Sequence, residues 1–512
     1  MNKRVNAVFA RAALVAVASV FVAQMHVDAA EYLFPNADAS GDIASVAAWN
    51  DAMPDMSDTN TIVKITPDST TRYTISTDMT LPQLLVSGGS AGGKATFDLT
   101  PAPGEDPVKV TMTGSVTVVS KRNVEFIGGV WDFGSKYKIV EGYQNYGDRD
   151  IVLSGGTVWT NVLGNNFTYN YGYGCSNNRL FVTDGSKVNF ISNHFYINEY
   201  GTCSNVVIAA ESGGFIDFAS GIVLGRGSSY PTYHKLLCKG AGSRIELSGR
   251  FDMGASGDKN NLIEASDGGV IRFKNGTPYL TYSDGNGGVT ATGNVLRAVG
   301  EGSKITFGPA YFGRSANVKD ESGNVTNWVG SYDNTIEALD GGLISNQLYY
   351  VRGKGNGFVI SNGVVATTGR GILCESGCTN AFVRFQGNCP RLIHHNSPNG
   401  FDYNSAFRFI YDLPPDGYAE GVIPMQAFVW GQFASDTKLE INGIEEVKKR
   451  MFKQNVSTRE FVLWNFANGG SAITSDMVAR WQSQLPEGAV LSGNYTLKLT
   501  IHVQTGTMLM FR

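Results

Sequence analysis

Hydrophobic and polar positions alternate in short runs between residues 150 and 370, and each run follows a Gly-Gly, Gly-Ser or Asn-Gly pair. The first residues of the eight pairs, spaced 21 to 39 residues apart, are Gly155, Gly185, Gly213, Gly242, Gly268, Gly302, Gly341 and Asn362. Three residues further on, every copy has Val or Ile: Val158, Val188, Ile216, Ile245, Ile271, Ile305, Ile344 and Val365. Five residues further on, the copies have Thr160, Phe190, Phe218, Leu247, Phe273, Phe307, Asn346 and Thr367, with mostly polar residues between. A period of two predicts a β-strand with one buried face after each pair.

The repeat is compatible with two folds. In a sandwich of hairpins, each Gly pair would form a tight antiparallel turn. In a parallel β-helix, each copy is one coil and equivalent residues stack on one another. The segments Asn261–Gly269 and Asn334–Gly342 have nearly the same sequence, so the strand before each Gly pair and the strand after it both keep their register from copy to copy. We therefore predict an all-β, single-stranded parallel β-helix, a pectin-lyase-like solenoid.

The rest of the chain divides around this solenoid. We expect a signal peptide over residues 1–30, an N-terminal cap with early coils over 31–122, the main β-helix over 123–400 and a small mixed α/β cap over 401–512. Within the C-terminal cap, the pattern predicts helices over Ile441–Phe452 and Ser475–Leu485, the second capped by Ser475. A final hairpin is predicted from residues 495–503 and 507–511.

The N-terminus and the composition predict export. A basic start is followed by the apolar run Ala12–Ala23 and by small residues at Val27, Ala29 and Ala30, which is typical of a cleaved secretory signal. No other segment is long and apolar enough for a transmembrane helix. Charged residues make up 17% of the chain and the net charge is −4, so a nucleic-acid partner is not expected. We predict a secreted or cell-surface protein.

Six cysteines suit an oxidising compartment. Cys175 and Cys203 each lie ten residues before a Gly pair, so they occupy the same position in consecutive coils. Because stacked strands lie about 4.8 Å apart, which a disulfide can span, we predict a Cys175–Cys203 bond; the alternative is two packed free thiols. Cys374, Cys378, Cys389 and His394 have a spacing compatible with zinc, but a disulfide within this set suits an exported protein better, so no metal or other cofactor is expected.

Several sequence segments resemble the passenger domains of bacterial autotransporters. The resemblance covers most of the mature chain, but its motifs are weakly specific. These are the stacked Gly pairs, Ile43–Trp49, Thr61-Ile62-Val63, Tyr73-Thr74-Ile75 and Leu485–Gly488. The resemblance implies a right-handed β-helix, export and a surface role that is often adhesive. The family also carries a C-terminal translocator barrel, for which this sequence shows no pattern, so self-export and firm membrane anchoring are not expected.

Candidate chemistry is sparse. Asp148 and Asp150, in Gly147-Asp148-Arg149-Asp150, form the best acidic cluster, but a turn with a surface ion pair explains them as well. A glycoside hydrolase needs two carboxylates at a defined distance, and no catalytic set is evident. His394 and His395 precede Asn396-Ser397-Pro398, which predicts an exposed loop.

Tyrosines give a clearer indication of ligand binding. Tyr169, Tyr171 and Tyr173 alternate in an insertion before Gly185, so on a strand they would face one way. Rings on one exposed face can stack on sugars while Asp148 and Asp150 bind hydroxyl groups. The alternative is a tyrosine ladder that only shields the flank of the solenoid.

We therefore predict a secreted or surface-associated β-helix protein with a structural or adhesive role. The alternative is a carbohydrate-active enzyme, either a polysaccharide lyase or a hydrolase, or a glycan-binding module that uses a tyrosine-lined flank. The expected partner is an extracellular polysaccharide or a cell-surface component. Any activity is expected where the spacing breaks, before Gly155, before Gly185 and near Gly341.

Overall fold

A computed structural model of the chain describes most of residues 31–504. It leaves out residues 1–30, 34–40, 46–48, 50–52, 68, 88–91, 120, 137–138, 142–147, 164–175, 192–194, 198–203, 227–231, 256–258, 281–290, 314–315, 320, 323–324, 330, 375–377, 396–400, 404–406, 429–430, 467–472, 494 and 505–512.

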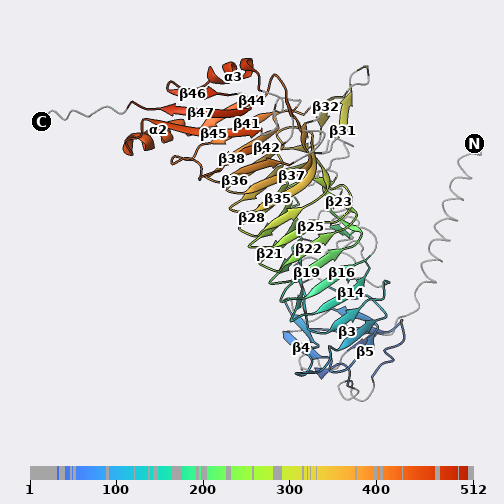
Figure 1. Cartoon of the computed structure of the whole chain (residues 1–512). Helices are drawn as coiled ribbons and strands as arrows, with labels where there is room; N and C mark the ends of the chain where they lie inside the picture. The colour runs from blue at the N-terminus through green and yellow to red at the C-terminus, as the bar shows by residue number, and fades with distance from the viewer. Residues whose placement is uncertain are drawn as a thin grey trace, which may run out of the picture.

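The chain winds into a parallel β-helix whose coils contribute strands to three faces, which confirms the predicted fold class (Figure 1). The first face is a fifteen-stranded parallel sheet. Its strands are β2 (Gly41–Asp42), β4 (Thr70–Thr74), β7 (Lys94–Asp98), β10 (Asn123–Ile127), β13 (Arg149–Ser154), β15 (Asn178–Val182), β18 (Val207–Glu211), β21 (Lys235–Lys239), β24 (Leu262–Ser266), β28 (Val295–Val299), β34 (Thr335–Leu339), β36 (Gly357–Ser361), β38 (Phe382–Gln386), β41 (Arg408–Asp412) and β44 (Lys438–Asn442).

The second face includes the strands that follow the eight Gly pairs. Its strands are β5 (Met79–Leu81), β8 (Lys109–Met112), β11 (Val130–Asp132), β14 (Val158–Val162), β16 (Lys187–Phe190), β19 (Phe215–Phe218), β22 (Arg244–Leu247), β25 (Val270–Phe273), β29 (Lys304–Thr306), the first parts of β35 (Leu343–Val351) and β37 (Val364–Cys374), β39 (Arg391–His394), β42 (Met425–Ala427) and β45 (Thr458–Phe466).

The third face closes each coil. In the early coils it is formed by β1 (Glu31–Leu33), β3 (Ile62–Ile65), β6 (Gln83–Val86), β9 (Val116–Val118) and β12 (Ile139–Glu141). In the later coils it is formed by β17 (Phe195–Ile197), β20 (Gly221–Arg226), β23 (Arg250–Ala255), β26 (Tyr279–Leu280), β30 (Pro309–Phe312), the second parts of β35 and β37, β40 (Phe401–Tyr403) and β43 (Gly431–Phe433). Two small pairs lie beside it: β27 (Ala291–Thr292) with β33 (Ser331–Tyr332), and the antiparallel β31 (Ala316–Lys319) with β32 (Val325–Val329).

The Gly pairs form the tight turn between the first and second faces. In the copy at Asp267–Gly268, both residues have positive φ, a conformation in which glycine avoids a steric cost. The residue after these two, which is Gly269 in this copy and Gly214 in another, is often glycine for a different reason. A Cβ at Gly214 would overlap the carbonyl oxygen of Val182, one coil earlier. The repeat therefore records both a backbone conformation and the close approach of neighbouring coils.

The inward positions of the second face agree with the prediction in seven of the eight copies. Three residues after the first member of each pair the side chain is buried, with 0 or 1% exposure, at Val188, Ile216, Ile245, Ile271, Ile305, Ile344 and Val365. The prediction is wrong at Val158, which is only partly buried and pairs with Lys187. Trp159 is the inward residue there, because Gly155 and Gly156 both adopt positive φ and the turn is displaced by one residue.

Asparagines form a polar column inside the turn that precedes the first face. Asn261, Asn294, Asn334 and Asn356 are at most 1% exposed and lie one coil apart. Each Nδ2 donates to the Oδ1 of the asparagine in the next coil, at 3.0, 3.1 and 2.9 Å. The same oxygens accept from backbone N–H groups at 3.0, 2.9 and 3.0 Å. The column therefore satisfies buried polar groups that no strand pairing reaches.

The C-terminal cap covers the open end of the core. It contains α2 (Ile444–Lys453), α3 (Ser475–Gln482), β46 (Ala489–Ser492) and β47 (Thr496–His502), and β47 pairs antiparallel with β45 and β46. Trp481 of α3 packs edge-on against Trp464 at 5.7 Å. The predicted capping residue of this helix is wrong: Thr474, not Ser475, is the N-cap and accepts from the N–H of Met477. The predicted hairpin strand over 507–511 lies outside the described residues.

Parallel pairing extends beyond the predicted limits of the main helix, through the early coils at one end and through β41 and β44 at the other (Figure 1). No helix in the described part of the chain is both long and apolar enough to cross a membrane.

Replacement of Asn294 by alanine tests the asparagine column. The change removes the acceptor of two hydrogen bonds from Asn261 and leaves buried groups unpaired, so we expect a loss of about 2–4 kcal/mol in the free energy of unfolding. Denaturant unfolding measures this loss. The matched control is Asn189→Ala on the outer surface, which removes a single bond to Asp217 and should cost less than about 1 kcal/mol. Equal losses would contradict the role of the column.

The predicted Cys175–Cys203 bond involves two residues outside the described part of the chain, so it stays a prediction. Their neighbours support it: the hydroxyl oxygens of Ser176 and Ser204 lie 2.9 Å apart in adjacent coils, and Asn177 donates its backbone N–H to the carbonyl of Ser204. Peptide mapping without reduction should recover a cross-linked peptide that contains both cysteines. Alkylation of both thiols in the unreduced protein would refute the bond.

Candidate functional site

The residues predicted to bind a ligand are only partly described. Tyr169, Tyr171 and Tyr173 lie outside the described residues. Asp150 forms a two-point ion pair with Arg179 in the next coil, at 2.5 and 2.8 Å. Asp148 accepts from Nδ2 of Asn177 at 2.8 Å. Both carboxylates therefore connect one coil to the next, and their ligand-binding role stays a prediction.

His394 lies inside the solenoid, which corrects the expectation of an exposed loop at this histidine. It is the last residue of β39, is fully buried, and its Nδ1 lies 2.8 Å from Oγ1 of Thr367. Burial, together with the charge of neighbouring His395, lowers the pKa of His394 to about 3. A buried, neutral imidazole of this kind affects the stability of the fold and is not accessible to a substrate.

The candidate zinc ligands do not converge. No disulfide joins Cys374, Cys378 and Cys389 to one another in the structure, so the expected disulfide within this set is wrong. Across the described ranges, no three His, Cys, Asp or Glu side chains are placed to share a metal ion.

A pair of carboxylates on the outer side of the second face bears on the enzymatic alternative. Asp217 and Glu246 are strand partners in adjacent coils, and Nζ of Lys274 contacts both, at 3.3 Å from Asp217. Burial works to lower the pKa of Lys274, but the hydrogen bond to Glu246 and the charges of the two carboxylates raise it above its usual value. Arg244 also pairs with Glu246. A glycosidase acid is a protonated carboxyl in an apolar setting, whereas both of these carboxylates are bound to cations.

The third face carries a ladder of tyrosines on its outer side. Tyr279, Tyr311 and Tyr350 are strand partners in β26, β30 and β35. Their ring centroids lie 5.4 and 4.8 Å apart, and their planes differ by 10° and 19°. All three side chains are partly exposed, and the residues on either side of each in the strand, such as Ala310 and Phe312, point into the core. We call these three residues the tyrosine ladder.

The surroundings of the tyrosine ladder fix its position and both of its ends. The guanidinium of Arg352 lies 4.7 Å from the centroid of the Tyr311 ring, a cation–π contact. Below Tyr279, the strand partner is Asp252, which is fully buried and accepts from Nε of Arg250 at 2.6 Å. Above Tyr350, the strand partner is Leu373. The outer column therefore runs from an ion pair, over three aromatic rings, to an apolar side chain.

The ladder combines surface aromatic rings with phenol hydroxyls, which both donate and accept hydrogen bonds. The ring centroids are 5.4 and 4.8 Å apart. All three side chains are partly exposed, so part of each ring is left open to solvent. Such rings can pack against the C–H groups of a sugar while the hydroxyls bind its polar edge.

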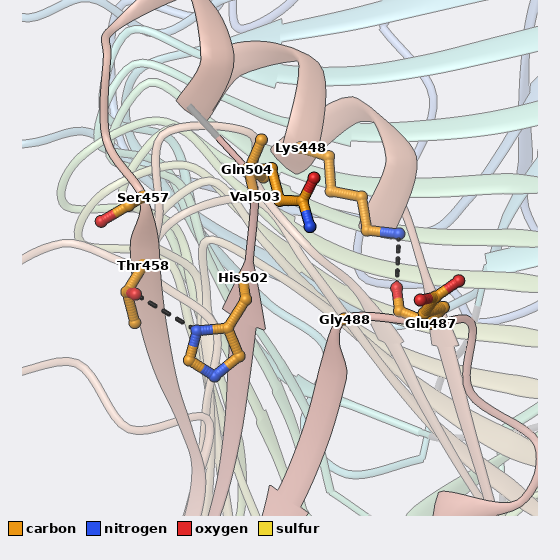
Figure 2. A pocket seen from close by; sticks show the side chains of 8 residues that line it. All are labelled: Lys448, Ser457, Thr458, Glu487, Gly488, His502, Val503 and Gln504. Atoms are coloured by element: carbon orange, nitrogen blue, oxygen red, sulfur yellow. Dashed lines mark hydrogen bonds between the residues drawn. The ribbon is translucent and has the colours of Figure 1, made fainter. Parts of the chain in front are cut away.

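A second candidate is a pocket of about 640 Å³ in the C-terminal cap (Figure 2). Lys448 of α2 donates to the backbone carbonyl of Glu487 at 2.9 Å. Figure 2 shows this contact, and it shows Thr458 facing His502. The Nδ1 of His502 lies 3.2 Å from Oγ1 of Thr458. No Phe, Tyr or Trp lines the pocket. The first contact holds α2 to the segment before β46, and the second joins β45 to β47. We therefore regard the tyrosine ladder as the better candidate site.

The sequence contained a signal for the ladder. Tyr311 and Tyr350 each follow a Gly pair by nine residues, counted from Gly302 and Gly341, and each is flanked by apolar residues. Tyr279 follows Gly268 by eleven residues, so the three tyrosines do not stand at one constant distance from their Gly pairs in the sequence.

Comparisons with known proteins add little. No protein-family model matches the chain, and no curated protein matches it. Among solved structures, the chain is similar to the tailspike protein of E. coli bacteriophage HK620, solved as a double mutant, at 11% sequence identity over 86% of this chain and 87% of that one. The TM-score is 0.32, a level of likeness that carries no argument about function.

The buried histidines predict a loss of stability in mild acid. Burial lowers the pKa of His234 and of His394 from about 6.5 to about 3. Between these values the unfolded chain takes up a proton at each residue and the folded chain does not, so stability falls with pH by about 1.4 kcal/mol per unit for each histidine. Above pH 6.5 neither the folded nor the unfolded chain takes up a proton at these histidines, so none of this stability is lost.

Unfolding midpoints at pH 7.5 and 5.0 measure this effect, because carboxylates with ordinary pKa values stay ionised over that range. His394→Gln should lower the difference between the two midpoints. His502→Gln, at an exposed residue of the cap, should leave it unchanged. An unaltered difference in the His394 variant would contradict the prediction.

Proposed function

We propose that this protein is an exported, non-catalytic β-helix protein that binds an extracellular polysaccharide on the third face of the solenoid and so serves an adhesive role. The observation that carries the proposal is the tyrosine ladder, in which three partly exposed rings lie in register on one face. Export rests on the signal-like N-terminus, which lies outside the described residues.

The position of the ladder supports binding. Inward residues of the same strands already fill the core, with Ala310, Phe312 and Tyr349 at most 1% exposed. The outer tyrosines are not required to close it. On the outer side of the first face, comparable columns hold alternating charges, such as Glu264, Arg297 and Glu337. An aromatic column at this place is better suited to a ligand with both C–H and hydroxyl groups than to water.

A lyase or hydrolase is the second candidate function. Among the described residues, it is favoured by Asp217 and Glu246, which lie in adjacent coils close enough for one ammonium group to contact both. Incubation of the mature protein with a polysaccharide panel separates the two. Release of reducing ends or of unsaturated products would overturn the non-catalytic proposal.

Replacement of Tyr311 by alanine tests the ladder. It removes the middle ring and leaves Tyr279 and Tyr350 without the ring between them. We therefore expect at least a tenfold loss of affinity for a polysaccharide that binds the unmodified protein. Glycan-array binding followed by affinity measurement in solution reads this out. Tyr495→Ala, at a tyrosine of the cap that is 41% exposed, is the matched control and should bind as the unmodified protein does.

Tyr171→Ala provides the competing arm, since it removes the middle ring of the tyrosine set predicted from the sequence. Loss of binding in Tyr171→Ala with full binding in Tyr311→Ala would move the site away from the ladder. Unfolding midpoints close to that of the unmodified protein are required of every variant.

A further inference from the structure

The tyrosine ladder has a fixed repeat. Its rungs sit on consecutive coils, so their spacing along the solenoid is the strand spacing of about 4.8 Å, and the measured centroid separations of 5.4 and 4.8 Å agree with it. One rung therefore recurs with each coil, in the same orientation to within 19°. A ligand that places one unit on each of the three rungs must itself advance by this distance per unit along a straight line.

Extended polysaccharides meet this condition. In chains whose pyranose units are joined by equatorial, β-type linkages, each unit advances by a distance close to one strand spacing and the chain runs nearly straight. Successive units present alternate faces, and both faces carry axial C–H groups that can contact a ring. Chains with α-1,4 linkages curve and leave a straight ladder after one or two units. A single sugar would use only one rung, so it would gain nothing from the other two.

The ends of the ladder limit the length of chain that is bound. Asp252 follows below Tyr279, and it is buried and engaged by Arg250. Leu373 follows above Tyr350 and offers no hydrogen-bonding group at its side chain. Three aromatic rungs thus stand between two residues of different character, so the aromatic contacts end with the third sugar.

The middle rung is held by three contacts. Tyr311 stacks against a ring on either side, and Arg352 also packs on its ring at 4.7 Å. A row of rings that is already ordered loses little side-chain entropy when a ligand binds. This favours binding of a regular polymer across the whole row over adaptation of one rung to one sugar.

We propose that the tyrosine ladder binds an extended, β-linked polysaccharide parallel to the solenoid axis, with one sugar unit on each of Tyr279, Tyr311 and Tyr350. This inference rests on the proposed function, and it specifies the linkage class and the direction of the bound chain.

The test is a length series. Cello-, xylo- and manno-oligosaccharides of one to six units are titrated into the full chain by calorimetry, with malto-oligosaccharides of equal length as the α-linked comparison. For at least one β-linked series we expect no measurable binding of the monosaccharide, a several-fold gain in affinity for each unit up to three, and little gain beyond three. The malto series should not gain with length.

Variants at the end and the middle of the ladder sharpen the test. Tyr350→Ala removes an end rung and should move the plateau from three units to two. Tyr350→Phe keeps the ring and should keep the plateau at three. Tyr311→Ala should abolish the gain with length, and Tyr495→Ala should reproduce the unmodified series.

The outcomes separate the inference from the proposed function. Binding that is the same for one unit and for six, or equal for the malto and the β-linked series, would overturn the inference and leave polysaccharide binding in place. A plateau that Tyr350→Ala does not move would overturn the assignment of one sugar to each rung. Absence of binding to every glycan, in both this series and the array, would overturn both proposals.

Discussion

Most strands in the solenoid pair with the equivalent strand one coil earlier and one coil later, and the rest of the structure depends on this pairing. A residue then meets its own counterparts above and below at about 4.8 Å, so each position becomes a column. Ile245 lies between Ile216 and Ile271 for this reason. A column is stable only when its members suit one another, which explains why the sequence repeats side-chain type while its loops vary in length.

Polar columns show how strict the constraint is inside the core. The asparagine column succeeds because an amide both donates and accepts, so each member pairs with the next. The column through Asn346, Thr367 and His394 is different, since it takes the place that Phe218, Leu247 and Phe273 occupy in earlier coils. Thr367 and His394 pair with each other, whereas the Asn346 side chain is buried without a protein partner. We therefore regard this part of the core as less stable than the coils before it.

The columns also explain what could be predicted from the sequence. The fold and most inward positions follow from the Gly pairs, because a tight turn sets the register of the strand after it. The register at Val158 was wrong because two glycines allow the turn to shift by one residue. His394 was misassigned for a related reason: it occupies the same column as Thr367, but Cys389-Pro390 stands where the Gly pair would be. The tyrosine ladder was missed because loops of unequal length precede Tyr279 and Tyr311, so its rungs align only in space.

The tyrosine ladder is both a structural column and a candidate binding surface, and the two roles support each other. Stacked rings stabilise adjacent coils by about 0.5–1.5 kcal/mol per pair beyond their burial, so part of their presence needs no ligand. Stacking of this kind also holds each ring in one orientation before any ligand arrives, which lowers the entropy lost on binding. A column that served stability alone would be equally well served by buried aliphatic residues or by the paired charges of the first face. Partly exposed rings with hydroxyl groups, repeated at the strand spacing, are instead suited to a partner that repeats as the solenoid does.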